Sequence, residues 1–114
     1  MYYQKYGNKY KNIRQTYNGR SYASKLEAQY AYELDLRKKA GEVIDWKPQF
    51  KVDLRVNGIH ITNHYVDFWV KLKDGSEQLV ECKGLETDLW RIKRNLLEAT
   101  FLKERPEIEY IVVK

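Results

Sequence analysis

The spacing of hydrophobic and polar residues predicts a small hairpin and then a helix at the start of the chain. Residues 13–17 and 20–23 favour β-structure and flank Asn18-Gly19, two residues that tolerate the positive φ angles of a tight turn. Ser24 offers an N-cap for the helix, and Gly41 can end it after three basic residues. The apolar stripe of this helix comprises Leu26, Tyr30, Ala31 and Leu34.

Three strands are expected after this helix, because β-branched and aromatic residues gather between turn signals. The first strand contains Pro48, which lacks an amide donor and therefore indicates an edge position or a bulge. Turns are predicted at Asn57-Gly58 and at residues 73–75. The strands are expected at residues 43–54, at 65–72 (or over a longer stretch starting near Ile59) and at 78–83.

A second helix and a last strand complete the pattern. Thr87 can cap the helix, and Pro106 lies beyond its end. The strand at 108–113 is almost wholly apolar, which favours burial on both faces, as in a parallel pair joined by a crossover helix. The apolar positions of the helix are Leu89, Ile92, Leu96 and Ala99.

The order of helix, three strands, helix and strand predicts an α/β or α+β fold with a mixed sheet. A chain of 114 residues and 13.7 kDa has room for one core. We therefore expect a single domain over residues 1–114, with an arm and hairpin at 1–23 and a core at 24–114.

The composition indicates the class of protein and its expected cellular location. Hydrophobic residues make up 43% and charged residues 32%, which is typical of a globular protein. No apolar run reaches the ~20 residues of a membrane helix, and the N-terminus lacks the apolar stretch of a signal peptide. One cysteine excludes a disulfide within the chain. We expect a cytoplasmic protein without a membrane partner.

Positive charge is concentrated at the N-terminus, although the whole chain carries only +5. Residues 1–26 contain six basic and no acidic residues, together with six of the ten tyrosines. Basic and aromatic side chains in alternation favour a polyanion with stacking bases, although a solvated arm has the same composition. The basic residues are Lys5, Lys9, Lys11, Arg14, Arg20 and Lys25.

The turn at residues 73–75 sets the expected register of the second and third strands. A three-residue loop with Gly75 in the left-handed region pairs Leu72 with Ser76 and therefore Asp67 with Glu81. Directly opposed residues share a face of the sheet. One face is expected to hold Val66, Phe68, Val70, Val80 and Cys82. The other is expected to hold Asp67, Glu81 and Lys83 among Tyr65, Trp69 and Leu79.

Two opposed carboxylates suggest a cation between them. Their side chains start ~5 Å apart and repel each other by a few kcal/mol at an effective dielectric near ~20. Mg²⁺ would bind Asp67, Glu81, the Cys82 carbonyl and waters, with the ammonium of Lys83 at the same spot. The alternative is a charged cluster on a half-exposed sheet.

Glu27 adds a third carboxylate, because its helical position points it toward the apolar stripe. A carboxylate on that face needs a partner, and the metal site would supply one. Ser24 and Glu27 also form a capping-box pattern, and the two roles can coexist. By contrast, His60 and His64 are expected on the sheet surface, and the Cys82 thiol is expected in the core.

The arrangement resembles the PD-(D/E)XK nuclease superfamily, and within it a small phage-encoded group. Similar motifs occur in Holliday-junction resolvases and in transposon-end-cleaving endonucleases. Asp67 follows Val66 here rather than proline. The matching stretches are Lys9-Tyr10-Lys11-Asn12, Tyr17-Asn18-Gly19, Ser24-Lys25-Leu26-Glu27-Ala28, Tyr65-Val66-Asp67-Phe68 and Val80-Glu81-Cys82-Lys83-Gly84.

This resemblance implies a restriction-endonuclease-like αβββαβ core and a metal-dependent endodeoxyribonuclease. The catalytic residues would be Glu27, Asp67, Glu81 and Lys83, and Mg²⁺, with Mn²⁺ as a substitute, would be held by Asp67, Glu81, the Cys82 carbonyl and Glu27. No organic cofactor is implied. Residues 24–114 would form the catalytic core.

The implied partner is branched or otherwise structured DNA in phage recombination or replication, which places the protein in the host cytoplasm. Paired cleavage by so small a chain would favour a two-fold homodimer. The alternatives are a non-catalytic DNA-binding or recombination-accessory protein, or an RNA-binding module that uses the tyrosine-rich arm. The expected nucleic-acid contacts are Lys9, Lys11, Arg14, Arg20, Arg91, Lys93 and Arg94.

Overall fold

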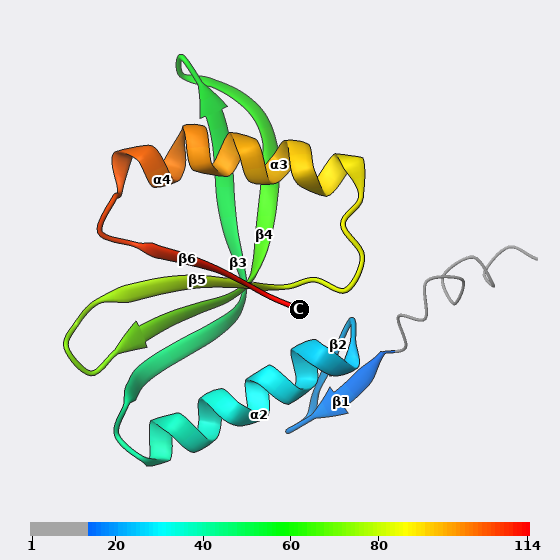
Figure 1. Cartoon of the computed structure of the whole chain (residues 1–114), viewed down its shortest axis with the longest axis vertical. Coiled ribbons are helices and arrows are strands. Elements are labelled where there is room, and N and C mark those ends of the chain that lie inside the picture. The colour runs from blue at the N-terminus through cyan, green and yellow to red at the C-terminus, as the bar shows by residue number, and fades with distance from the viewer. Residues whose placement is uncertain (1–13) are drawn as a thin grey trace, which may run out of the picture.

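The computed structural model describes residues 14–114 and shows an α+β fold, drawn in Figure 1. Its element order confirms the predicted hairpin followed by helix, three strands, helix and strand. Lys9 and Lys11 lie outside the described residues. The elements are β1 (Gln15–Tyr17), β2 (Arg20–Tyr22), α2 (Lys25–Lys39), β3 (Val43–Val56), β4 (Ile59–Leu72), β5 (Glu77–Cys82), α3 (Asp88–Ala99), α4 (Phe101–Glu104) and β6 (Glu109–Val113).

Local signals set the hairpin and α2 as the sequence predicts. Asn18 and Gly19 have φ angles of 51° and 81°, which join β1 to β2 in a two-residue turn. The Ser24 hydroxyl accepts a hydrogen bond from the Glu27 amide at 3.1 Å, and Gly41 follows the helix at φ 84°. None of the helices within residues 14–114 is long and apolar enough to cross a membrane.

The four-stranded sheet has the order β3-β4-β5-β6 and is mixed. β3 is an edge strand, as Pro48 predicts, and it continues through that residue to Val56. β4 takes the longer of the two expected forms and begins at Ile59. β5 and β6 are parallel and are joined by α3 and α4, which confirms the predicted crossover.

β6 has both faces covered, as predicted, but it is not fully buried. Ile111 and Val113 contact the core beside α2, whereas Tyr110 contacts the core beside α3. All three residues are half-buried because β6 forms the other edge of the sheet.

The predicted register of β4 and β5 is confirmed. The Leu72 amide donates to the Ser76 carbonyl at 2.8 Å, and Phe68 lies opposite Val80. The same register would place Asp67 opposite Glu81, but the ladder ends at the Phe68–Val80 pair. The carboxylates thus lie where the two strands begin to separate.

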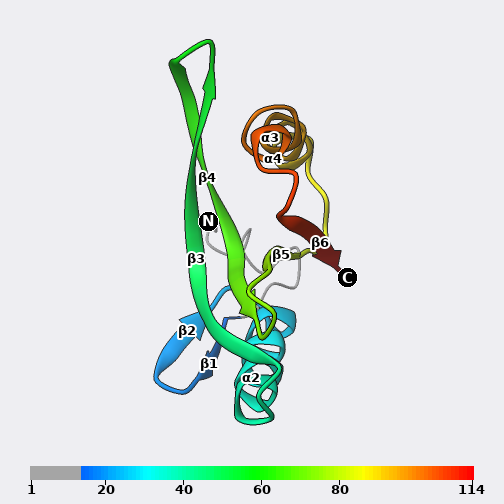
Figure 2. The same ribbon diagram turned by 90° about the vertical axis from the view of Figure 1, so that its left-hand side faces the viewer.

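β4 changes the layer against which it packs at Asp67. Phe68 and Val70 belong to the core beside α2, but Val66 belongs to the core that contains Leu97 of α3. The expectation that Val66 shares a face with Phe68 is therefore wrong. Gln49, between the residues paired with Phe68 and Val66, has φ 55°. Figure 2 shows the β3–β4 ribbon running on past β5, with α3 beside its far half and α2 near its other end.

The buried face of α3 also differs from the predicted one. Trp90 and Leu97 are buried, and the predicted Leu96 packs partly buried against the same core as Leu97, whereas Leu89 and Ile92 are 63% and 57% exposed. Both sets keep helical spacing, so periodicity alone could not choose between them. The choice was made by the direction in which α3 crosses the twisted ribbon of β3 and β4.

We predict that Leu97→Ala lowers the free energy of unfolding by about 3 kcal/mol, because it leaves a cavity in a fully buried position. Leu89→Ala, on the same helix, is the matched control and should change stability by less than about 0.5 kcal/mol. Urea unfolding followed by circular dichroism measures both. If Leu89→Ala lowered the free energy of unfolding more than Leu97→Ala, the buried face of α3 would be the one that the sequence predicted.

Candidate active site

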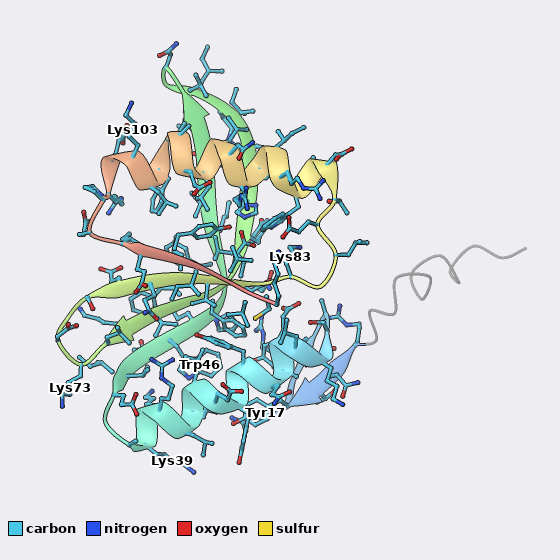
Figure 3. All side chains as sticks on the ribbon, viewed as in Figure 1. Tyr17, Lys39, Trp46, Lys73, Lys83 and Lys103 are labelled. Atoms are coloured by element: carbon cyan, nitrogen blue, oxygen red, sulfur yellow. The ribbon has the colours of Figure 1, made fainter. Side chains whose placement is uncertain are left out.

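A pocket of about 290 Å³ lies between β4, the end of β5 and the start of α3. Three of the four predicted catalytic side chains line it, namely Asp67, Glu81 and Lys83. Figure 3 shows Lys83 just beyond β5, where the chain leaves the sheet toward α3. The remaining lining residues are His64, Tyr65, Thr87, Leu89, Trp90 and Lys93.

Asp67 occupies the end of the β4–β5 ladder. Its Oδ2 accepts a hydrogen bond from the Cys82 amide at 2.8 Å. In a continuing antiparallel ladder that amide would donate to Val66, so the carboxylate replaces a backbone acceptor. Burial, and then the negative charge of Glu27, raise the pKa of Asp67 to about 7.

Glu81 is buried and fully engaged on one oxygen. Its Oε2 accepts hydrogen bonds from the Tyr110 hydroxyl at 2.5 Å and from His64 Nε2 at 2.8 Å. Because a carboxylate only accepts, Nε2 carries the hydrogen of that bond. Burial alone would raise the pKa of Glu81, but the hydrogen bonds from His64 and Tyr110 outweigh it and hold the pKa below its ordinary value.

His64 is 4% exposed, so the expectation that it lies on the sheet surface is wrong. His60 is exposed as expected, with its Nδ1 2.5 Å from Asp53. The alternation of β4 carried a signal, because His64 lies two residues before the buried Val66. No comparable signal identified Tyr110, whose contact with Glu81 depends on how β6 docks.

Glu27 lies at the position that the capping-box pattern predicts, and its side chain is buried. It is 6% exposed on the inner face of α2, and Ser24 Oγ lies 3.5 Å from its Oε2. Burial raises the pKa of Glu27, and the positive charge of Lys83 opposes that rise. Glu27 and Lys83 line a second pocket of about 150 Å³ together with Cys82. The structure therefore places Glu27 next to the first pocket rather than in it.

Lys83 links these two pockets. Its Nζ lies 5.6 Å from the centre of the Trp90 ring, and its backbone amide donates to Val113 at 2.8 Å. No carboxylate in the described part of the chain lies within ion-pair distance of this ammonium. Its positive charge is therefore available to a further anion.

The donor set suits a hard cation, although no ready-made cage is present. Within residues 14–114, no three His, Cys, Asp or Glu side chains form a metal-binding group. Mg²⁺ commonly uses one or two carboxylates together with waters and substrate phosphates. The hydrogen bonds described above fall on Asp67 Oδ2 and Glu81 Oε2, and the Trp90 indole also helps to lower the pKa of Glu81. The other oxygen of each carboxylate is where a cation would bind.

Cys82 could contribute only its backbone. Its side chain is buried in the core beside α2, as the sequence predicts. Burial, followed by the negative charge of Asp67, raises the pKa of the thiol to about 12, so the sulfur stays protonated at neutral pH. Trp69 does not line the first pocket; its indole N–H instead donates to Glu77 at 2.8 Å.

The residues expected to contact nucleic acid differ in whether their positive charge is already paired with a carboxylate. Lys93 lines the first pocket. Arg91 forms ion pairs with Glu86 and Asp88, so its charge is already partnered. Arg94 pairs with Glu98 and lies over the Trp90 ring at 5.3 Å. Arg14 and Arg20 line a third pocket together with Glu27.

Tyr110→Phe should lower the free energy of unfolding by about 1–3 kcal/mol, because it removes one of the two donors to the buried Glu81 carboxylate. Tyr32→Phe serves as the control, since that ring is 48% exposed. Chemical denaturation at pH 7 gives both values. Equal effects of the two substitutions would mean that the Tyr110 hydroxyl does not stabilise Glu81.

The raised pKa of Asp67 predicts a pH dependence of stability in the absence of divalent cations. The folded chain binds this proton more tightly than the unfolded chain, so the free energy of unfolding should fall as pH rises from about 4 to about 7. The loss should amount to a few kcal/mol. Asp67→Asn should remove it, because an amide oxygen can still accept from Cys82 without titrating.

Urea unfolding in EDTA between pH 5 and pH 8 tests this dependence. Asp88→Asn provides the control, since the Asp88 side chain is 98% exposed and should leave the pH profile of the wild type unchanged. A profile that Asp67→Asn leaves as steep as before would assign the titration to another group.

Comparison with known proteins adds a family to this geometry. No curated protein matches the chain. A family model described as "Protein of unknown function (DUF1064)" matches residues 5–112, which is nearly the whole length. The chain therefore belongs to the DUF1064 family.

Proposed function

We propose that this protein is a Mg²⁺-dependent DNA endonuclease of the PD-(D/E)XK type, acting on branched or otherwise structured DNA. The observation that carries the proposal is the pocket that holds Asp67, Glu81 and Lys83 together, with Glu27 in the adjoining pocket. They match, in type and in order along the chain, the helical Glu, the strand Asp and the Glu-x-Lys of that superfamily.

The charges of this group favour a cation and a phosphate together. Three carboxylates and one ammonium leave a net negative site that repels DNA by itself. A divalent cation held by Asp67 and Glu81 would cancel that negative charge and so admit the phosphate. Glu27 would contribute to the same cation directly or through a water.

When bound, Mg²⁺ would lower the pKa of a water and offset charge on the scissile phosphate. Lys83 would orient the attacking water and stabilise the negative charge that develops on the phosphate oxygens. Trp90 keeps the ammonium near the pocket, since its ring lies beneath Nζ at 5.6 Å. His64 and Tyr110 hold Glu81 in one orientation through their shared contact with Oε2.

The small size of the chain bears on its assembly. One such site cuts one strand, so paired cleavage in phage recombination or replication would favour a two-fold homodimer. A non-catalytic DNA-binding or recombination-accessory protein is the alternative. Buried carboxylates that destabilise one another speak against it, because a binding surface alone has no need of them.

We expect Asp67→Asn and Lys83→Ala each to lower the cutting rate by at least about 100-fold, because Asp67 would hold the cation and Lys83 would stabilise charge on the scissile phosphate. DNA affinity should stay within a few-fold of the wild type. Plasmid DNA and a four-way junction, each incubated with and without Mg²⁺, provide the assay. Glu107→Gln and Lys103→Ala, at exposed positions of the C-terminal third, are charge-matched controls.

The outcomes separate the two functions. Mg²⁺-dependent cutting that the site variants lose and the controls keep supports the nuclease. Binding of either DNA without any cutting by the wild type in Mg²⁺ or Mn²⁺ would favour the accessory protein instead. Equal cutting by the wild type, Asp67→Asn and Lys83→Ala would mean that the residues are misassigned.

A further inference from the structure

The β1–β2 hairpin presents two arginines whose charges are not neutralised locally. Arg14 donates from Nε to Ser21 Oγ at 3.0 Å and from Nη2 to the Ser21 carbonyl at 3.4 Å. The guanidinium carbon of Arg20 lies 5.9 Å from the centre of the Tyr22 ring. Within residues 14–114, no carboxylate lies in ion-pair distance of either arginine. Both guanidinium groups are therefore oriented by the hairpin and still have donors to offer.

These arginines line a pocket of about 220 Å³ that also contains Ser21, Glu27 and Gln49. Glu27 is shared with the pocket of Lys83, so the hairpin pocket continues the proposed active site. Its two positive charges outnumber the single carboxylate. The net positive charge suits a singly charged anion such as a phosphodiester. A guanidinium group can bind a phosphate through two parallel N–H···O hydrogen bonds.

Gln49 supplies an independent sign of function. Its φ of 55° lies in the left-handed region, which is unfavourable for a residue that carries a side chain. It sits in the middle of β3, where the register places it opposite Asp67. Such strain gathers at functional sites, where the surrounding structure holds it. Glycine would relieve the strain but would lose the amide that lines the pocket.

We propose that Arg14, Arg20 and Gln49 form a binding site for a backbone phosphate of the DNA strand next to the scissile phosphate. The inference rests on the proposed function, and it identifies residues that bind the DNA backbone beside the cleavage site. The two guanidinium groups and the Gln49 amide donate to the phosphate oxygens. The contact carries no sequence information, because it reads only the backbone.

The test uses the full chain with Asp67→Asn, so that affinity is measured without cutting. The probes are a fluorescein-labelled 20-nucleotide single strand and the corresponding duplex, followed by anisotropy at several KCl concentrations. Arg14→Ala/Arg20→Ala should weaken binding at least about 10-fold at low salt. It should also reduce the slope of log affinity against log salt by about 0.7 to 0.9, the equivalent of one phosphate contact.

Lys73→Ala/Lys103→Ala is the matched control, since it removes the same charge from exposed residues that Figure 3 places on the other side of the molecule from the hairpin. This control should weaken binding less than about 3-fold. Gln49→Gly should weaken binding several-fold while leaving the unfolding midpoint unchanged or higher, because it removes strain together with the amide.

Equal losses in the two double variants would overturn the site, because they would show a diffuse effect of net charge. An unchanged affinity of Arg14→Ala/Arg20→Ala would overturn it as well. If that variant fails to fold, Arg14→Lys/Arg20→Lys decides: it keeps the charge but loses the paired donors, and full affinity would exclude the proposed grip. None of these readouts depends on cutting, so failure here is separate from failure of the nuclease.

Discussion

The hydrogen bond from the Cys82 amide to the Asp67 carboxylate is the contact on which the rest of the site depends. It closes the β4–β5 ladder with a side chain in place of a backbone carbonyl, and it does so where β4 leaves β5. The separation lets the far half of β4 follow α3, while its near half stays with α2. His64 can then reach Glu81 from a strand that no longer runs beside β5.

The three carboxylates are treated differently by their surroundings. Glu81 is the most buried and has two donors on one oxygen, which keep its pKa below the ordinary value. The pKa values of Asp67 and Glu27 are raised by burial and by neighbouring negative charge. The fold therefore favours the ionised form of Glu81 and disfavours the ionised forms of Asp67 and Glu27. A bound cation would stabilise the ionised forms. The proposed function therefore accounts for a cluster of buried carboxylates that stability alone disfavours.

Lys83 occupies the junction of the two pockets that carry these carboxylates. On one side it shares a pocket with Asp67, Glu81 and Lys93, and on the other it shares one with Glu27. Beyond Glu27 lies the hairpin, which packs on α2 and also reaches the sheet through Tyr22, whose ring centre lies 6.1 Å from that of Phe68. In the proposed nuclease, this succession of basic groups on either side of the carboxylates would follow a strand through the site.

The sequence by itself determined the parts that depend on neighbours along the chain. Asn18-Gly19, Ser24 and Thr87 set a turn and two helix starts, and the loop at residues 73–75 fixed the register that brings Asp67 to Glu81. Only the tertiary structure decided which face of α3 is buried, which layer Val66 joins, and that His64 and Tyr110 meet on Glu81. Those outcomes depend on how far the β3–β4 ribbon twists away from β5, a quantity set by the summed packing of two cores rather than by any local residue pattern.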